Sequence, residues 1–172
     1  ISTTGFATAD YVFWPVFSQM VLILLMFCGA CAGSTGGGIK CSRILILGRC
    51  IRRELHRIVH PRSVEVVRLD GKVLDDDTVN SVLVFISCYI LAILSAAALL
   101  SLVDGTSFAV PFSAALTCIS NVGPGLQEIG PMGNFSAFSS FSKGVLSFLM
   151  ILGRLEIFPL LVLFTPSAWR RS

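Results

Sequence analysis

A glycine-rich stretch at the end of a long uncharged run constrains this chain more than any other feature. Residues 29–38 read GACAGSTGGG, and no charged residue occurs between Asp10 and Lys40. In a lipid bilayer, each backbone N–H or C=O group without a helical partner costs several kcal/mol. Irregular backbone survives at that depth only where protein buries it or where it lines a water-filled cavity. The stretch is therefore either an exposed turn of a soluble protein or irregular backbone inside a membrane protein.

The composition favours a membrane protein. Of the 172 residues, 54% are hydrophobic and 13% are charged, whereas about 25% of the residues are charged in an average soluble domain. The Lys and Arg residues are concentrated between Lys40 and Lys72. Because an apolar helix is expected on each side of this basic segment, the positive-inside rule explains it better than nucleic-acid binding does. We therefore expect a multi-pass membrane protein with residues 40–76 and the C-terminus in the cytoplasm.

Apolar segments of different lengths follow one another along the chain. Residues 11–28 and 79–103 carry no charge and are long enough for helices that span a bilayer. Residues 107–119 would rise only roughly 20 Å as a helix, which is too short to cross a hydrocarbon core of about 30 Å. That length is typical of a re-entrant helix, and a glycine turn at 120–125 follows it. A last helix, containing Arg154, Glu156 and Pro159, is expected over 144–169.

The segment after the glycine stretch has the pattern of a basic amphipathic helix. From Ile39 to Val59, apolar and basic residues alternate at helical spacing. Pro61 ends this helix because proline cannot continue the backbone hydrogen-bond ladder. The dipeptide at 70–71 is Asp-Gly between alternating apolar and polar residues, so a small cytoplasmic β-hairpin is expected over 63–74. The glycine stretch thus interrupts one helix whose second half emerges into the cytoplasm.

Cysteines and histidines do not complete a metal site in the sequence. Cys28 and Cys31 are the only close pair of cysteines, and no second pair completes a four-ligand zinc site. His56 and His60 have the i, i+4 spacing of metal ligands, but a solvated pair at the membrane surface is the simpler interpretation. No Ser-His-Asp set or pair of acids converges in the sequence, so an enzyme is not expected.

Two short turns have the composition of a carbonyl-lined ion filter. The run SNVGPG at 120–125 follows a short apolar helix, which is the layout of a potassium-channel pore loop. In such loops backbone carbonyls replace the hydration shell of the ion, and glycine permits the backbone geometry that aims them. The run TTGF at 3–6 has the makings of a similar tight turn.

An equal spacing links the two halves of the chain. Gly5 and Gly36 are 31 residues apart (36 − 5), and so are Gly123 and Arg154 (154 − 123). If both helices descend from one filter ring, Arg154 lies at the depth of the glycine stretch. A guanidinium carries five donors, and irregular backbone has unpaired carbonyls. We therefore expect Arg154 to hold the glycine stretch across the pore; in the alternative, Arg154 and Glu156 only neutralise charges on other helices.

Several runs of sequence resemble those of one transporter family. The runs CAGSTGGGIK (31–40), NVGPGL (121–126) and GRLEIFPLLVLFTPSAW (153–169) closely resemble the TrkH-type membrane subunit of the Trk/Ktr/HKT superfamily of potassium transporters. The runs TTGFATADY (3–11) and HRIVHP (56–61) are similar to its third pore turn and its cytoplasmic connector. The resemblance covers essentially the whole chain.

The resemblance implies an all-α membrane protein with potassium-channel-like repeats of helix, pore loop and helix, a broken gating helix and a small cytoplasmic β-hairpin. Residues 1–62 would be the end of the third repeat, 63–76 a cytoplasmic hairpin and linker, and 77–172 the fourth repeat. The parts of the fourth repeat would be an outer helix at 79–103, a pore helix at 107–119, a filter at 120–125 and an inner helix at 144–169. The chain would thus be the C-terminal fragment of a longer protein.

The resemblance also implies the residues of the site. Gly5 and Gly123 match the filter glycines of the third and fourth repeats. The expected filter residues are Thr4, Gly5, Asn121, Val122 and Gly123, with potassium bound at Thr4, Gly5, Val122 and Gly123. The expected gate residues are Gly33, Ser34, Thr35, Gly36, Gly37, Gly38 and Arg154. Potassium is expected as the transported ion, and no catalytic cofactor is expected.

The expected function is potassium uptake across the cytoplasmic membrane through a glycine-lined carbonyl filter gated by the intramembrane loop. The alternative is a non-conducting membrane scaffold or receptor segment. A phosphate-binding loop is disfavoured because Ile39-Lys40 stands where that motif needs Lys-Ser or Lys-Thr. The expected partners are membrane lipid, the N-terminal pore repeats of the same protein, a second copy in a homodimer and a cytoplasmic nucleotide-binding ring of the TrkA type. Nucleic acid is not expected, and the sequence leaves open the K⁺/Na⁺ preference.

Overall fold

The computed structural model describes residues 3–29, 31, 33, 34, 36–61, 66–69, 71–156 and 159. Apart from one short hairpin, the regular elements of these residues are helices, as expected from the apolar pattern. In chain order the elements are η1 (Tyr11–Phe13), α1 (Val16–Phe27), α2 (Cys41–Val59), β1 (Arg68–Leu69), β2 (Lys72–Val73), α3 (Asp76–Asp104), α4 (Ala109–Ser120), η2 (Gln127–Ile129), η3 (Phe135–Ala137) and α5 (Ser140–Arg154).

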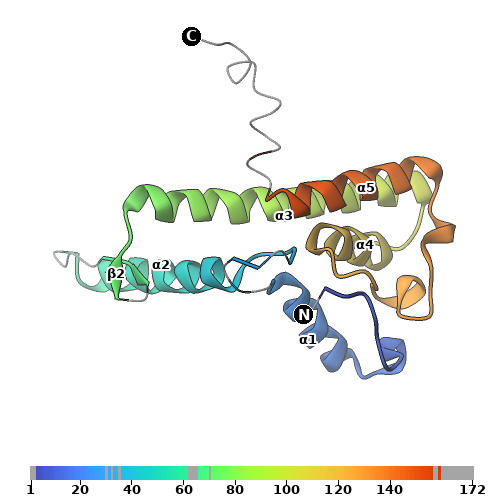
Figure 1. The fold of residues 1–172 in the computed structure, drawn as a ribbon, viewed down its shortest axis with the longest axis horizontal. Helices are drawn as coiled ribbons and strands as arrows, with labels where there is room; N and C mark the ends of the chain where they lie inside the picture. The colour runs from blue at the N-terminus through green and yellow to red at the C-terminus, as the bar shows by residue number, and fades with distance from the viewer. Residues whose placement is uncertain are drawn as a thin grey trace, which may run out of the picture.

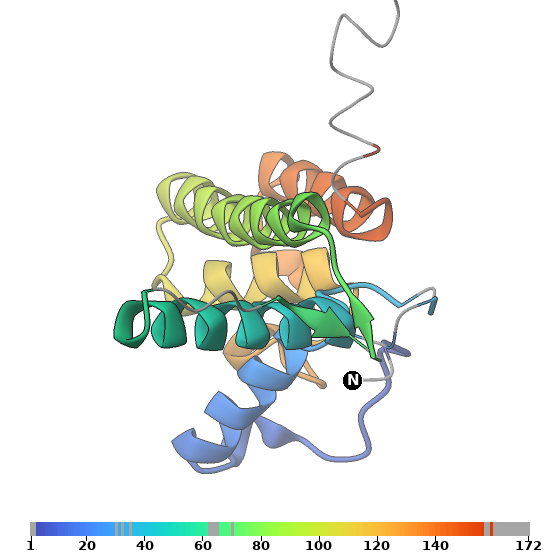
Figure 2. The ribbon, with the colours of Figure 1, turned by 90° about the vertical axis from the view of Figure 1, so that its left-hand side faces the viewer.

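The short helix α4 lies at the centre of the described structure. It packs against α3 and α5 on one side and against α1 on the other (Figure 1). Figure 2 shows α3 and α5 side by side, with α4 beneath them and α1 below α4. Ten of the twelve residues of α4 are buried. A helix of roughly 18 Å that is covered on its sides cannot span a bilayer alone, but it can support a turn at its end.

Helix α3 is the longest element. Among the described residues, it is the one helix long and apolar enough to cross a membrane by length and composition. Asp76 and Asp77 lie in its first turn, where the helix dipole favours negative charge. Gly105 closes its far end in the left-handed conformation, with φ of 61°. Its 29 residues rise roughly 44 Å, which exceeds a hydrocarbon core of about 30 Å.

Helix α1 is shorter than the sequence pattern suggests. The prediction of a spanning helix over 11–28 is wrong, because the helix comprises only the 12 residues from Val16 to Phe27. The Asp10 carboxylate instead caps a separate 3₁₀ turn by accepting from the Val12 N–H at 3.1 Å. Trp14 and Pro15 are extended, so the two helical pieces do not join. At roughly 18 Å, α1 is too short to cross a bilayer by itself.

Helix α2 runs beside the first half of α3 in the opposite direction (Figure 1). It begins at Cys41 rather than at Ile39, because Ile39 pairs with Cys28 in an isolated parallel β-bridge. It ends at Val59, just before Pro61. The Arg43 guanidinium carbon lies 3.9 Å from the centroid of the Phe85 ring. Helix α2 thus runs alongside α3 toward the N-terminus of α3.

The hairpin is present, and the last helix begins earlier than predicted. Strands β1 and β2 pair antiparallel over two described residues each, and residues 63–65 and 70 of the predicted hairpin lie outside the described residues. Helix α5 begins at Ser140, four residues before the predicted start, because the Ser139 hydroxyl caps it by accepting from the Ser142 N–H at 3.2 Å. Most of the predicted inner helix beyond Glu156 lies outside the described residues.

Candidate ion-conducting site

The two predicted filter glycines meet in space. Gly5 has φ of +79° and Gly123 has φ of +106°, conformations that side chains of L-residues rarely adopt. A Cβ atom on Gly123 would lie 3.2 Å from the Gly5 Cα, and one on Gly5 would lie 3.8 Å from the Val122 carbonyl oxygen. We call the two segments, residues 3–5 and 121–123, the turn pair. Its glycines are required both for backbone conformation and for close approach.

The second member of the turn pair is built on the end of α4. Asn121 adopts the left-handed conformation, with φ of 53°, and terminates the helix. The Val122 N–H donates to the Thr117 carbonyl at 3.0 Å, which folds the turn back onto α4. The Asn121 side-chain amide donates to the Met150 carbonyl of α5 at 3.3 Å. The turn is therefore attached to two helices.

Deeper support for this end of α4 comes from α3 and α5. The Tyr89 and Ser120 hydroxyls share a buried hydrogen bond of 2.7 Å. Gly153 of α5 lies against the Ile119 carbonyl so closely that any Cβ there would clash. Buried polar groups of this kind cost free energy unless they are paired, so the Tyr89–Ser120 bond fixes where α4 ends.

Residues 29–38, which we call the glycine loop, lie between α1 and α2, and all of them except residues 30, 32 and 35 are described. Its two ends are joined by backbone bonds: the Gly29 N–H donates to the Ile39 carbonyl at 2.8 Å, and the Ile39 N–H donates to the Phe27 carbonyl at 3.2 Å. A Cβ atom on Gly29 would lie 2.5 Å from the Gly37 carbonyl oxygen. The glycine at position 29 thus allows the two ends of the loop to touch.

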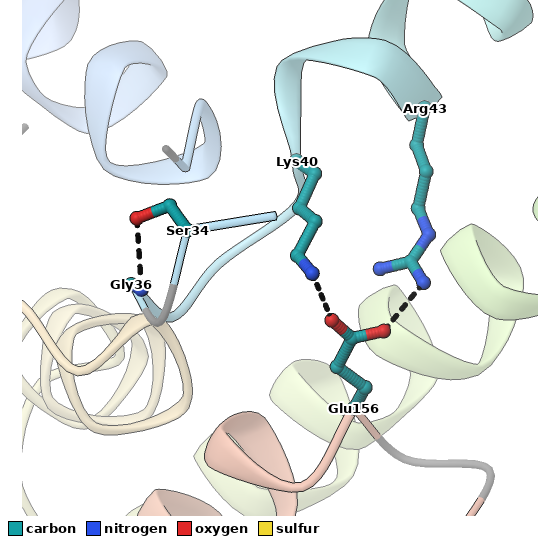
Figure 3. A network of polar contacts seen from close by, with 5 residues as sticks. All are labelled: Ser34, Gly36, Lys40, Arg43 and Glu156. Atoms are coloured by element: carbon teal, nitrogen blue, oxygen red, sulfur yellow. Dashed lines mark hydrogen bonds and ion pairs between the residues drawn. The ribbon is translucent and has the colours of Figure 1, made fainter. Parts of the chain in front are cut away.

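One side of the glycine loop packs against α4, next to the turn pair. A Cβ atom on Gly37 would lie 2.5 Å from the Ser120 carbonyl oxygen and 3.0 Å from the Asn121 Cβ. The other side is open: a Cβ on Gly33 would have no atom within 4 Å, and Ser34 is exposed. The Ser34 hydroxyl accepts from the Gly36 N–H at 3.3 Å (Figure 3). The loop therefore touches the residues that lead directly into the second turn.

Charged side chains join the end of the glycine loop to the end of α5. The Glu156 carboxylate accepts from the Lys40 ammonium and from Arg43 Nη2, the latter at 2.7 Å (Figure 3). The side chains of Lys40, Arg43 and Glu156 are 20%, 19% and 38% exposed, so the pairs are only partly screened by solvent. We call these three residues the loop base. Because Lys40 follows the loop by two residues, the loop base fixes where the loop rejoins α2.

Comparison with known proteins identifies the family. The family described as "TrkH: Cation transport protein" matches residues 1–171. This chain belongs to the TrkH family. TrkH of Vibrio parahaemolyticus, a Trk system potassium uptake protein, is 42% identical over 99% of this chain and 35% of its own length. TrkH of Escherichia coli K12, which carries the same description, is 39% identical over 98% of this chain and 34% of its own length.

A solved structure gives the same result for the fold. The crystal structure of the potassium transporter TrkH from Vibrio parahaemolyticus superposes with a TM-score of 0.88 at 41% identity. The match covers 98% of this chain and 36% of that one. The chain thus spans about a third of the length of the TrkH relatives it matches. Its helical arrangement is that of a TrkH protein, and these relatives are named as transporters rather than enzymes.

The structure describes most of the predicted filter and gate residues of this TrkH-family chain. The structure brings Gly5 and Gly123 together and places Gly37 beside the end of α4. Thr4 is exposed at the first turn, and Thr35 lies outside the described residues. The described gate residues Gly33, Ser34, Gly36, Gly37 and Gly38 all belong to the glycine loop.

In the described structure, Arg154 does not take part in the ion pairs of the loop base. Its side chain is exposed, and among the described residues it makes no hydrogen bond or ion pair. Because Thr35 and two other loop residues are not described, its contact with the loop stays a prediction. The pairing of Glu156 with Lys40 and Arg43 agrees, for Glu156, with the alternative in which it neutralises charges of another helix. The signal for this pairing was present in the sequence, since Lys40 and Arg43 lie in the same basic segment that directly follows the loop.

The remaining metal-ligand candidates do not form a metal site within the described residues. The rings of His56 and His60 lie 4.8 Å apart, centroid to centroid, on α2. Within the described parts of the chain, no three His, Cys, Asp or Glu side chains form a group that could hold a metal ion. Cys28 and Cys31 are both free thiols at the glycine loop.

Proposed function

We propose that this chain forms the end of the third and the whole of the fourth pore repeat of a potassium uptake protein in the cytoplasmic membrane. The observation that carries the proposal is the backbone contact between Gly5 and Gly123, both at positive φ. Carbonyl oxygens at such turns replace the water around a potassium ion. In the proposed filter, Thr4, Gly5, Val122 and Gly123 supply these oxygens, and Asn121 anchors the second turn to α5.

Two neighbouring turns make half of a ring, so the other half must come from elsewhere. We assign it to N-terminal pore repeats of the same protein. Support comes from the relatives, which are described as Trk system potassium uptake proteins and are about three times the length of this chain. A half ring cannot surround an ion, so the chain conducts only when the other repeats are present.

The glycine loop is the proposed gate. It packs with Gly37 against the residues that lead into the filter, and its exposed side, at Gly33 and Ser34, faces away from α4. A loop of glycines has little steric resistance to rearrangement, so it can close the ion path and withdraw from it. We propose that the loop base holds the closed position and that Arg154 contacts the loop as it moves, since charged residues inside a membrane usually serve the ion path.

The proposed orientation places residues 40–76 and the C-terminus in the cytoplasm, in accordance with the basic charge of that segment. The proposed partners are a second copy of the protein and a cytoplasmic nucleotide-binding ring of the TrkA type. Such a ring would act on the gate by moving α2, because the glycine loop leads directly into that helix.

Growth of a bacterial strain that lacks its own potassium uptake tests the proposal. This chain replaces the matching third of TrkH from Vibrio parahaemolyticus, and we call the product the chimera. Intact TrkH is the positive control, and TrkH without the matching third is the negative control. The chimera should restore growth at low potassium and should take up Rb⁺. A chimera that reaches the membrane in normal amount but fails in both assays would favour the non-conducting scaffold.

A further inference from the structure

A tyrosine links the two stretches of chain that follow the turns of the turn pair. The Tyr11 hydroxyl donates to the Gly125 carbonyl at 2.9 Å, across 114 residues of sequence. Tyr11 lies six residues after Gly5, and Gly125 lies two residues after Gly123. The hydrogen bond therefore joins the chain that follows one turn to the chain that follows the other, and it is a second link between these regions besides the glycine contact.

The segment that carries Tyr11 is held firmly. Tyr11 begins the turn η1, which Asp10 caps through the Val12 N–H at 3.1 Å. The Gln19 side-chain amide of α1 donates to the Val12 carbonyl at 2.9 Å and to the Trp14 carbonyl at 3.0 Å. The Trp14 ring meets the Tyr11 ring edge-on, with centroids 6.5 Å apart. The position of the tyrosine hydroxyl is therefore set by contacts on both sides of it.

The accepting segment is equally confined. Gly125 is buried, and its N–H donates to the Ile129 carbonyl at 2.7 Å. The Ile129 side chain fills the space where a Cβ of Gly125 would lie. Gly130 packs against the Val12 side chain, because a Cβ there would lie 2.5 Å from Val12 Cγ2. The Tyr11 bond thus joins the hydrogen-bonded turn η1, which has no buried residue, to the buried turn at Gly125.

We propose that Tyr11 is a positioning residue that sets the spacing of the two carbonyl turns and thereby favours K⁺ over the smaller Na⁺. The inference rests on the proposed function of the turn pair as half of a filter. A filter selects by the size of its cavity and by the number of oxygens that reach the ion. A strut between neighbouring turns keeps them from closing around a smaller ion. Tyr11 itself contacts no ion in this scheme and acts through Gly125 and the turn that precedes it.

The test is Tyr11→Phe in the chimera, with the ratio of K⁺ to Na⁺ transport as the readout. This change removes the donor and keeps the ring. Loss of one hydrogen bond should lower the transport ratio by about threefold to tenfold, while the amount of protein in the membrane stays the same. The matched control is Ser87→Ala, which removes an exposed hydroxyl that donates to the Leu83 carbonyl at 2.9 Å within α3, away from both turns. That control should leave the ratio unchanged.

The outcomes separate this inference from the proposed function. If the chimera takes up potassium and Tyr11→Phe leaves its ratio of K⁺ to Na⁺ transport unchanged, the inference is wrong and the proposed function is unaffected. Absence of uptake in the unmodified chimera overturns the proposed function itself. If Tyr11→Phe does not reach the membrane, Gln19→Leu decides, because it frees η1 without altering the hydroxyl. A lower ratio in Gln19→Leu supports the strut, and an unchanged ratio contradicts it.

Discussion

The turn pair and the loop base hold their segments by different means. At the turn pair, backbone lies against backbone, and a Cβ on Gly123 would be 3.2 Å from Gly5. At the loop base, long flexible side chains reach across a partly exposed gap to Glu156. A glycine contact tolerates shifts of only a few tenths of an ångström, whereas an ion pair of this kind breaks at a modest cost. Under the proposed function, this difference corresponds to a rigid filter beside a releasable gate.

The largest expected effect comes from adding a methyl group to the turn pair. Gly123→Ala forces a side chain onto a backbone at φ of +106° and toward Gly5. Strain of this kind costs about 1–3 kcal/mol, so Rb⁺ uptake by the chimera should fall about tenfold or more. Gly105→Ala is the matched control, because Gly105 has φ of +61° but no atom within 4 Å of the position that the added methyl group would take. Equal uptake by the two variants would show that close packing at the turn pair is unimportant.

A smaller effect is expected at the contact between the glycine loop and α4. Gly37→Ala places a methyl group 2.5 Å from the Ser120 carbonyl oxygen, so the loop must move away from α4. The chimera should then pass several times more Rb⁺ at rest. Gly33→Ala, in the same loop, strains its own backbone but meets no neighbour. The proposed role of the contact is wrong if Gly33→Ala raises resting flux as much as Gly37→Ala does.

A still smaller effect is expected at the loop base. Glu156→Gln keeps the shape of the side chain but leaves Lys40 and Arg43 without a negative partner. The free energy of unfolding should fall by about 1–2 kcal/mol, between the values for exposed and buried pairs, and resting flux should rise. Thermal unfolding of the purified chimera in detergent measures the change in stability, and Rb⁺ uptake measures the resting flux.

The control for the loop base is Glu54→Gln. Glu54 pairs with Arg53 at 3.5 Å, and the Glu54 side chain is 51% exposed. Loss of this pair should therefore change neither the free energy of unfolding nor the resting flux measurably. A double-mutant cycle between Lys40→Gln and Glu156→Gln should give a coupling energy of about 1 kcal/mol. Strict additivity of the two changes would mean that the pair does not hold the loop.

The smallest expected effect is at the buried hydroxyl pair behind the turn. Tyr89→Phe leaves the Ser120 hydroxyl without its partner at 2.7 Å. The midpoint of thermal unfolding should fall by an amount that corresponds to about 1 kcal/mol, with Rb⁺ uptake nearly unchanged. A large loss of uptake without loss of stability would place Tyr89 in the ion path instead of behind it.

Local signals in the sequence predicted the parts of this site but not their meeting. Gly5 and Gly123 were recognisable because their turns need positive φ, which glycine adopts without strain. Pro61 similarly marked the end of α2. The contact of Gly5 with Gly123 depends on tertiary packing between segments far apart in the chain, which no local pattern encodes.

Competition between local interactions explains the other differences between the predictions and the structure. Pro15 is tolerated in a first helical turn, so the pattern permitted a helix from Tyr11, but the cap by Asp10 favours a separate 3₁₀ turn. The equal spacing of 31 residues favoured Arg154 as the partner of the glycine loop, whereas Glu156, two residues later, pairs with Lys40. Charge complementarity explains the pairing of Glu156, since the segment after the loop is basic, and the contact of Arg154 with the loop stays a prediction.

Anomalous diffraction from crystals of the chimera grown in Rb⁺ would locate the ions in the pore. We expect a Rb⁺ peak within coordination distance of the carbonyl oxygens of Thr4, Gly5, Val122 and Gly123, on the path that the glycine loop closes. A chimera that takes up Rb⁺ but shows its ion peaks only away from the turn pair would contradict the proposed filter.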